Sequence, residues 1–225
     1  MTATAAEPDR DCPLCPRLSA FRAGQREAHP TWHNAPVPSF GADARLLIVG
    51  LAPGLQGANR TGRCFTGDWA GDLLYETLDA FGFSQGHYAE DPDDGLTLVD
   101  TVITNAVRCV PPANKPTGPE IATCRPFLIG TMGQQPRLTV LVALGRIAHE
   151  SVLRALGQRL AAYPFGHGRE HAVSRIDGHA LTMIDSYHCS RYNTNTGVLT
   201  PPMFRAVFAR ARAILDGSAP VAQQA

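Results

Sequence analysis

The chain has 225 residues, of which 44% are hydrophobic, and its formal net charge is zero. This length and composition suit one domain with a buried core, and the zero net charge excludes a global basic field. Any nucleic-acid binding must therefore come from a local patch. Six cysteines are too few for a disulfide scaffold and no apolar stretch is long enough to span a membrane, so we expect a cytoplasmic protein.

Apolar runs alternate with helical patterns along the chain, which is typical of an α/β fold. Four runs have the continuous hydrophobicity of buried parallel strands, at 45–50, 97–107, 138–144 and 180–185. Apolar residues at helical spacing predict helices at 69–81, 119–132, 146–156 and 202–215. We therefore expect one domain over 1–225, with three αβα layers around a central four-stranded, mostly parallel sheet. Its core should run from Cys12 to Leu215, between disordered termini.

Four of the cysteines form two pairs that one metal centre could collect. Cys12 and Cys15 have C-x-x-C spacing, and Cys109 and Cys124 bracket the loop between the second strand and the next helix. A zinc ion or an iron–sulfur cluster held by these four thiolates would attach the N-terminus to that loop. The spacing does not distinguish the two kinds of metal centre.

The loop at 50–68 is rich in glycine and follows the first strand, where ligands bind in open α/β sheets. Within it, Arg60 and Arg63 could hold phosphates, and Phe65 offers an aromatic face. Asp68 comes just before a helix, so its carboxylate is either an N-cap or a catalytic group. The loop matches neither common phosphate-binding glycine pattern, which disfavours a mononucleotide-dependent enzyme.

Two further polar segments follow strands and should converge on the same pocket. His188 comes directly after the fourth strand, in a segment with Arg191 and Asn193 that can form hydrogen bonds and position phosphates. A thiol nucleophile at Cys189 is disfavoured, because neighbouring residues of extended backbone point in opposite directions.

The second strand ends in NAVRCVPPANKP, which presents Asn105, Asn114 and Lys115. An asparagine amide pairs a donor with an acceptor and can therefore read the edge of a nucleobase. For Asn114 the alternative is a turn residue in a proline-rich loop.

Together these segments resemble the family-five uracil-DNA glycosylases, the iron–sulfur branch of the uracil-DNA glycosylase superfamily found in bacteria and archaea. The resemblance covers nearly the whole chain and is most specific in two motifs, GLAPG-x-x-GANRTGR-x-FTGD and H-x-S-x-x-N-x-x-TG-x-LT. The first motif has Leu51 where family four has a glutamate, as expected for family five.

The resemblance implies a role for each candidate residue. It implies a [4Fe–4S] cluster on Cys12, Cys15, Cys109 and Cys124. It implies that Asp68 positions water, that His188 stabilises the leaving group, and that the base pocket includes Gly50, Ala52, Phe65, Asn105, Asn114 and Asn193. DNA phosphates would be held by Arg60, Arg63, Arg108, Lys115 and Arg191.

The expected function is therefore a DNA repair glycosylase that flips uracil, or another deaminated base, out of DNA and hydrolyses its glycosidic bond. Its partner is DNA, and we expect a monomer associated with a prokaryotic nucleoid. One alternative is an iron–sulfur module that recognises damaged or single-stranded DNA without cutting it. A zinc-dependent hydrolase is disfavoured, because neither H-E-x-x-H nor H-x-E followed by C-x-x-C occurs.

Overall fold

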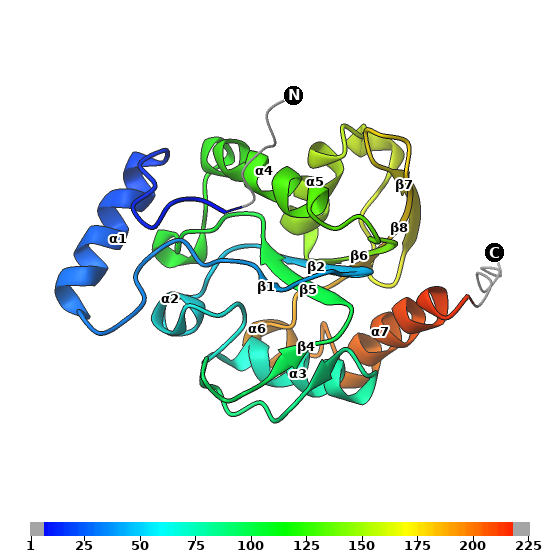
Figure 1. Cartoon of the computed structure of the whole chain (residues 1–225), viewed down its shortest axis with the longest axis horizontal. Coiled ribbons are helices and arrows are strands. Elements are labelled where there is room, and N and C mark those ends of the chain that lie inside the picture. The colour runs from blue at the N-terminus through cyan, green and yellow to red at the C-terminus, as the bar shows by residue number, and fades with distance from the viewer. Residues whose placement is uncertain (1–6, 218–225) are drawn as a thin grey trace.

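The computed structural model describes residues 7–217, in which a six-stranded mixed sheet forms the middle layer (Figure 1). The strand order is β1-β5-β2-β6-β8-β7. The four inner strands run parallel, and the edge strands β1 and β7 are antiparallel to their neighbours. The strands are β1 (Phe40–Gly41), β2 (Leu46–Gly50), β5 (Thr101–Asn105), β6 (Val140–Leu144), β7 (Glu170–Ser174) and β8 (Ala180–Ser186).

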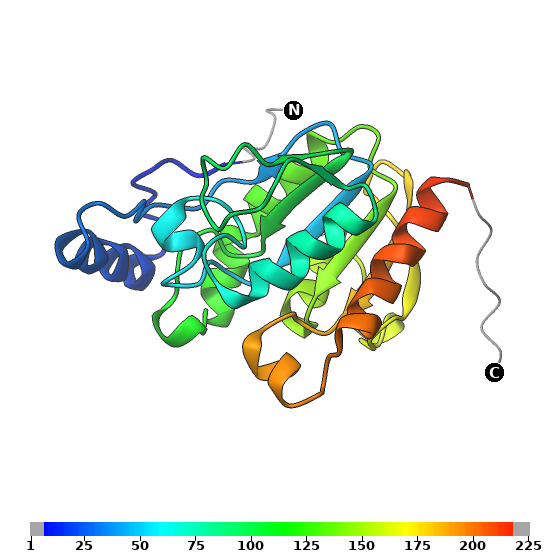
Figure 2. The ribbon, with the colours of Figure 1, turned by 90° about the horizontal axis from the view of Figure 1, so that it is seen from below.

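Helices cover both faces of this sheet (Figure 2). Helices α3 (Trp69–Ala80) and α7 (Pro201–Leu215) pack on one face, and α4 (Gly118–Gly133) and α5 (Arg146–Ala155) pack on the other. Helix α1 (Pro16–Ala28) lies beyond one end of the sheet (Figure 1). The shorter elements are α2 (Ala58–Thr61), α6 (Arg191–Asn195), η1 (Pro112–Asn114), η2 (Leu160–Ala162) and the hairpin of β3 (Ser84–Gln85) with β4 (Thr97–Leu98).

The inner strands are hydrophobic throughout because both faces of the sheet are covered. Along β2, Leu46 and Ile48 enter the core under α3 and α7, whereas Leu47 and Val49 enter the core under α4 and α5. Every residue of β2, β5 and β6 is buried. This pattern explains why sequence periodicity located these strands.

The α/β class is confirmed, but the sheet is larger than the four strands expected from the sequence. The additional strands are at the edges, where β1 has two residues and β7 alternates buried with more exposed positions. The apolar run at 97–107 is not one strand. It turns at Asp100, whose φ is 50°, and this turn separates β4 from β5.

The start of α4 connects the N-terminal helix to the sheet layer. Thr117 and Glu120 form a reciprocal capping box at this helix terminus. The same Glu120 carboxylate accepts two hydrogen bonds from Arg17 of α1, at 2.7 and 2.8 Å. Helix α1 is therefore held to α4 by a charge-assisted contact next to the cysteine loop.

The N-terminal segment is bound to the body of the protein earlier in the chain than we expected. Glu7 accepts hydrogen bonds from the Arg108 guanidinium at 2.9 Å and from the Ser39 amide at 3.0 Å. The remaining residues of the expected disordered termini, 1–6 and 218–225, lie outside the described residues. Between residues 7 and 217, each helix is too short or too polar to cross a lipid bilayer.

Arg63 lies in the core, although the sequence suggested a phosphate contact. Its guanidinium donates two hydrogen bonds of 2.7 Å to Asp94 and lies over the rings of Phe40, Tyr75 and Tyr88. The Arg63 guanidinium holds the pKa of the Asp94 carboxyl well below its usual range. The ionised pair therefore stabilises the fold above the ordinary pKa of an aspartate, and this contribution is lost as the pH falls below it.

Replacing Asp94 by alanine leaves the buried Arg63 charge without its carboxylate. We expect the free energy of unfolding to fall by about 3–5 kcal/mol. Glu76→Ala is the control, because it removes an exposed ion pair with Arg205 and should cost about 1 kcal/mol or less. Urea denaturation measures both losses, and equal losses would contradict a structural role for the buried pair.

Candidate active site

A cavity of about 430 Å³ opens at the carboxyl ends of β2, β5 and β8. This is the position at which ligands bind in open α/β sheets. The cavity brings together most of the residues that the sequence singled out for the site. Those among its lining are Ala52, Phe65, Asp68, Asn105, Asn114, His188 and Arg191.

The last residue of β2 permits the close packing at the base of this cavity. Gly50 pairs with Asn105 across the sheet, and a Cβ added to it would overlap the Asn105 amide oxygen and lie 2.7 Å from Cζ of Phe65. Phe65 itself has a φ of 52°, a left-handed conformation that is unfavourable for an aromatic residue. Surrounding contacts hold this strained residue, as is frequent at binding sites.

Asn105 supplies a buried polar group to the cavity wall. Its side chain is almost fully buried, and its Nδ2 donates to Sγ of Cys64 at 3.7 Å. Within residues 7–217, its Oδ1 has no hydrogen-bond partner. A buried acceptor without a partner is rare in folded proteins and indicates a ligand or an ordered water.

Asp68 is both a helix cap and a cavity residue, so the two alternatives from the sequence are compatible. Its Oδ1 accepts from the Ala70 amide at 3.2 Å and caps α3. Its Oδ2 is turned toward the glycine loop, where a Cβ on Gly54 would lie 2.8 Å away. Burial raises the pKa of Asp68, and hydrogen bonds from the amides of Gly71 and Ala70 partly oppose this change.

His188 follows β8 and lies beside Phe65, with the two ring centroids 5.9 Å apart and the planes 28° from parallel. Burial lowers the pKa of His188 to about 4, so its imidazole is neutral at neutral pH. Asn193 donates from Nδ2 to the His188 carbonyl at 2.8 Å. Asn193 thus supports the backbone of His188 and is not among the residues lining the cavity.

Cys189 points away from the cavity into the core, where its thiol contacts the Ala70 carbonyl at 3.4 Å. Burial raises the pKa of this thiol, which therefore stays protonated.

The basic residues divide into an exposed group and a buried group. Arg191 and Lys115 are exposed, and the Arg191 guanidinium lies over the ring of Trp69 at 5.4 Å. Arg60 is partly exposed and donates to the Gln56 carbonyl at 2.7 Å. Arg108 is buried like Arg63, and it is bonded to Glu7, so neither residue is available to DNA phosphates.

The four cysteines Cys12, Cys15, Cys109 and Cys124 line one small cavity between α1, α4 and the end of β5. Arg22 donates to Sγ of Cys109 at 3.2 Å, and the Arg108 amide donates to Sγ of Cys124 at 3.3 Å. Burial raises the pKa of the Cys109 thiol to about 11 and of the Cys124 thiol to about 12. Without a metal both thiols would stay protonated, whereas a bound metal would deprotonate them.

The spacing of these thiols does not suit a single ion. Sulfur atoms bound tetrahedrally to zinc lie about 4 Å apart. Among residues 7–217, the one group of three or more potential ligands within 4.8 Å of one another is His149, His171 and Asp185. No three of these four thiols, all within the described residues, lie as close together as ligands of one zinc ion. The Arg22 guanidinium beside Cys109 would offset the negative charge of four thiolates in either kind of metal centre.

Sequence reasoning missed Arg22 and the buried group of His149, His171 and Asp185. Arg22 falls in a helix with low overall hydrophobicity, and no motif marks its buried position. His149 could have been noticed, because it occupies the apolar face of α5 together with Val152.

Comparison with known families identifies the class of protein. The family model described as the uracil DNA glycosylase superfamily matches residues 37–212, which include the cavity and two of the four cysteines. The chain belongs to this superfamily.

The most informative relatives belong to one branch of the superfamily. A type-5 uracil-DNA glycosylase of Thermus thermophilus is 45% identical, over 89% of this chain and 92% of the relative. Type-5 enzymes of Pyrobaculum aerophilum and Mycobacterium tuberculosis are 38% and 40% identical, over 90% and 89% of this chain and 88% and 77% of the relatives. These similarities group the chain with the type-5 enzymes.

The lowered pKa of His188 predicts how the protein responds to acid. The folded state binds this proton less readily than the unfolded state, so stability should fall as the pH drops from about 6.5 toward 4. Imidazole NMR should show a neutral His188 at pH 5, and His188→Gln should weaken the acid-induced loss of stability in urea denaturation. A ring that titrates near pH 6.5 would contradict the buried environment.

Proposed function

We propose that the protein removes uracil from DNA by hydrolysing its N-glycosidic bond, the activity named for its type-5 relatives. The observation that carries the proposal is the cavity, which combines an aromatic ring, a buried acceptor without a partner among residues 7–217, and a neutral histidine. The aromatic ring can stack on the face of uracil, the acceptor can bind its imide N–H, and the histidine can stabilise the negative charge on the departing base. A base inside a duplex must be flipped out to reach such a cavity.

Base recognition is assigned to Phe65 and Asn105. The Phe65 ring provides a face on which a planar base stacks, which typically contributes about 1–3 kcal/mol. The Oδ1 of Asn105 can accept the imide N–H of uracil, whereas the ring nitrogen of cytosine at that position is itself an acceptor. Because Cys64 holds the Asn105 amide nitrogen, the acceptor is the group left for the base. The site would thus favour deaminated bases.

His188 is assigned to the leaving group. Departure of uracil places negative charge on the base, and a positioned N–H donor stabilises that charge. The neutral imidazole still has one N–H group, and that group can donate a hydrogen bond to the departing base. Asn193 holds the His188 backbone. Asn114 lines the cavity as a second contact to the base, from a left-handed backbone conformation that asparagine adopts readily.

Asp68 is assigned to the attacking water and to the developing sugar cation. The first motif has Leu51 in the position of the family-four acid, so Asp68 is the carboxylate that the cavity offers. Its Oδ1 is engaged in the helix cap, which leaves Oδ2 for water. The cap also fixes the carboxylate, so that it needs little reorganisation during the reaction.

The cofactor is proposed to be a [4Fe–4S] cluster on Cys12, Cys15, Cys109 and Cys124. The spacing of the thiols, wider than that of ligands of one zinc ion, supports a cluster over a zinc ion, and Arg22 would offset the negative charge of the thiolates. When bound, it supplies a structural centre that joins α1 to the loop after β5. That loop carries Asn114, and Ala52 packs against the cysteine site and lines the active-site cavity.

DNA is proposed to bind across the mouth of the cavity, with Arg60, Lys115 and Arg191 contacting phosphates. Arg63 and Arg108 are excluded from this set by their burial. The active form is proposed to be a monomer. A DNA substrate would associate the protein with the nucleoid.

Base release tests the proposed function directly. Oligonucleotides with one uracil, single-stranded or paired with guanine, should yield an abasic site that alkali cleaves. Parallel substrates with hypoxanthine, xanthine or ethenocytosine define the range of bases. Binding of uracil DNA without base release would instead support a recognition module.

For Asp68, replacement by asparagine preserves the helix cap and removes the charge. We expect normal stability and a single-turnover rate at least about tenfold lower, equivalent to about 1.4 kcal/mol of barrier. Thr200→Ala, which removes only the cap of α7, should lose about 1 kcal/mol of stability and keep the rate. An Asp68→Asn enzyme with the parental rate would remove the carboxylate from the mechanism.

For DNA binding, Arg191→Gln should reduce the slope of log affinity against log salt by about one. Arg154→Gln is the matched control, because Arg154 is an exposed residue of α5 on the opposite face of the sheet. The control should leave the slope unchanged. Equal slopes for Arg191→Gln and the parent protein would place the DNA elsewhere.

For the cofactor, purified protein should be brown and contain about four iron and four sulfide per chain. Cys109→Ser should lose most of the iron and much of the folded yield, because metal binding contributes to folding. Cys189→Ser, which alters a buried thiol of the core, should retain the iron. Colourless parent protein with stoichiometric zinc would contradict a cluster.

A further inference from the structure

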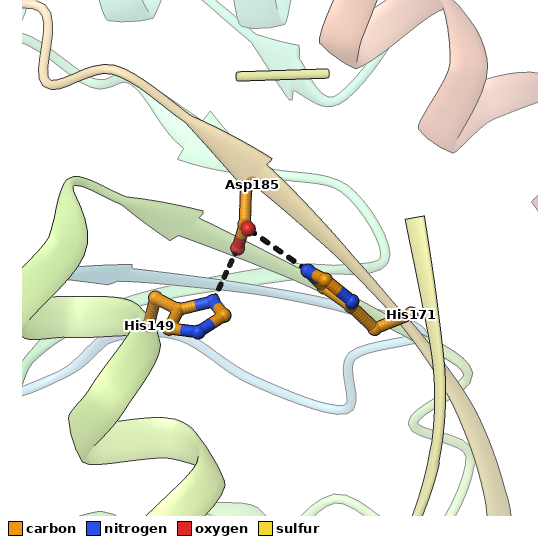
Figure 3. Close-up of side chains that lie close together, drawn as sticks. All are labelled: His149, His171 and Asp185. Carbon is orange, nitrogen blue, oxygen red and sulfur yellow. Dashed lines mark hydrogen bonds and ion pairs between the residues drawn. The ribbon is translucent and has the colours of Figure 1, made fainter. Parts of the chain in front are cut away.

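Three buried residues outside the cavity form a polar group that the proposed chemistry does not use (Figure 3). Asp185 of β8 lies between His149 of α5 and His171 of β7. Its Oδ1 is 2.7 Å from Nδ1 of His149, and its Oδ2 is 2.9 Å from Nε2 of His171. The side chains of all three residues are at most 5% exposed.

A carboxylate and two neutral imidazoles do not carry enough protons for all the hydrogen bonds of this group. One additional proton is required. Nδ1 of His149 faces the Asp185 carboxylate, and its Nε2 faces the Tyr163 carbonyl at 2.9 Å. Both partners are acceptors, and Asp185 also accepts from His171 and from the Gly166 amide at 3.1 Å. All contacts are satisfied when a proton is shared between His149 and Asp185.

A shared proton accounts for the geometry better than a metal ion. Two ligands of one tetrahedral ion, each about 2.0–2.1 Å from it, lie more than about 3 Å apart. The two contacts to Asp185 are 2.7 and 2.9 Å, which are hydrogen-bond lengths.

Hydrogen bonds with His149 and Asp185 hold the backbone of the loop 163–169 next to the end of β8. His149 holds the Tyr163 carbonyl, and the Asp185 carboxylate holds the Gly166 amide. The loop in turn binds the strand, because the Gly168 amide donates to the Asp185 carbonyl at 2.8 Å.

The loop also reaches the residue before the proposed leaving-group histidine. His167 accepts a hydrogen bond on Nδ1 from the Tyr187 amide at 3.1 Å and stacks on the Tyr187 ring at 5.0 Å. Burial lowers the pKa of His167, which keeps Nδ1 free to accept this bond. His188 is the next residue, so the loop contacts the backbone immediately before it.

We propose that His149, Asp185 and His171 form a proton-sharing latch that positions His188 through the loop 163–169. The three are positioning residues, and their effect on catalysis rests on the proposed base release. Loss of the shared proton leaves two acceptors facing each other without a hydrogen and places a net negative charge in the core. The latch therefore depends on the proton that His149 and Asp185 share.

Other ionisable groups around the latch belong to each element packed against it. The loop contributes Tyr163, His167 and Arg169, and α5 contributes Arg146, which lies over the Phe165 ring. Glu170 of β7 is paired with Arg210 of α7 on the other face of the sheet. Asp185→Asn isolates the latch from these groups, because its amide can donate to a neutral His149 while its oxygen still accepts from His171 and Gly166.

The first test uses histidine NMR on the full-length protein with its metal centre. Because both partners of His149 are acceptors, its ring in the parent should carry a proton on both nitrogens or share one with Asp185, and in Asp185→Asn it should be protonated on Nε2 only. In single-turnover base release with saturating enzyme, Asp185→Ala should slow the reaction and Asp185→Asn should restore most of the rate, because its amide keeps the hydrogen bonds. A singly protonated, non-sharing His149 in the parent, or equal loss of rate in Asp185→Ala and Asp185→Asn, would overturn the latch.

The second test uses His149→Phe, which keeps the ring and removes both hydrogen bonds. Amide exchange in 163–169 should accelerate, and base release should slow by about tenfold to a hundredfold, the scale for misplaced catalytic groups. Unchanged exchange would overturn the latch even if the parent had no glycosylase activity, because exchange does not depend on the reaction. A metal that is lost in His171→Ala while the cysteine site stays loaded would also overturn it.

Discussion

The absence of a side chain at Gly50 is the constraint on which the site depends. Gly50 ends β2 opposite Asn105, and the space a Cβ would take is filled by the Asn105 amide and the Phe65 ring. The Phe65 ring packs there from a residue in a left-handed backbone conformation, with a φ of 52°. The strain is tolerated because the parallel strands on either side are buried and rigid.

Removal from water then determines the chemical properties of the polar side chains that line the cavity. It keeps His188 neutral and raises the pKa of Asp68, and the Asn105 acceptor has no partner in the described part of the chain. Each of these three features is energetically unfavourable in the protein without a ligand, but each favours binding of a nucleobase. The protein therefore combines a stable sheet with a local cluster of groups that a ligand would satisfy.

Two more distant groups of residues lie beside the loops that carry these side chains. The four cysteines line a cavity between α1 and the loop that leads to Asn114. Hydrogen bonds of Asp185 hold 163–169 against the strand that precedes His188. Both lie outside the cavity and contact its walls through the backbone or through small residues such as Ala52. Precision at the site thus depends on contacts that never reach the substrate.

The sequence predicted the inner strands and the main helices because their hydrophobic periodicity is strong, as in β6 and α3. It missed β1 and β7, since edge strands have little continuous hydrophobicity, and it missed helix α1, which buries few apolar residues. It placed Asp68 and His188 correctly beside one cavity, because both follow strands whose carboxyl ends meet.

Burial by distant segments could not be predicted in the same way. Arg63 looked like a phosphate contact because its partner, Asp94, lies 31 residues further along the chain. The dual position of Asp68, as cap and cavity residue, depends on the path of the glycine loop around it. The polar group at Asp185 brings together three elements that no local pattern connects.

The most direct test of the account is single-turnover release of uracil by His188→Ala, with DNA affinity measured in parallel. If a neutral His188 stabilises the departing base, the rate should fall by about a hundredfold to a thousandfold while affinity for uracil-containing DNA changes little. A variant that releases uracil at the parental rate would contradict the central role given to this histidine.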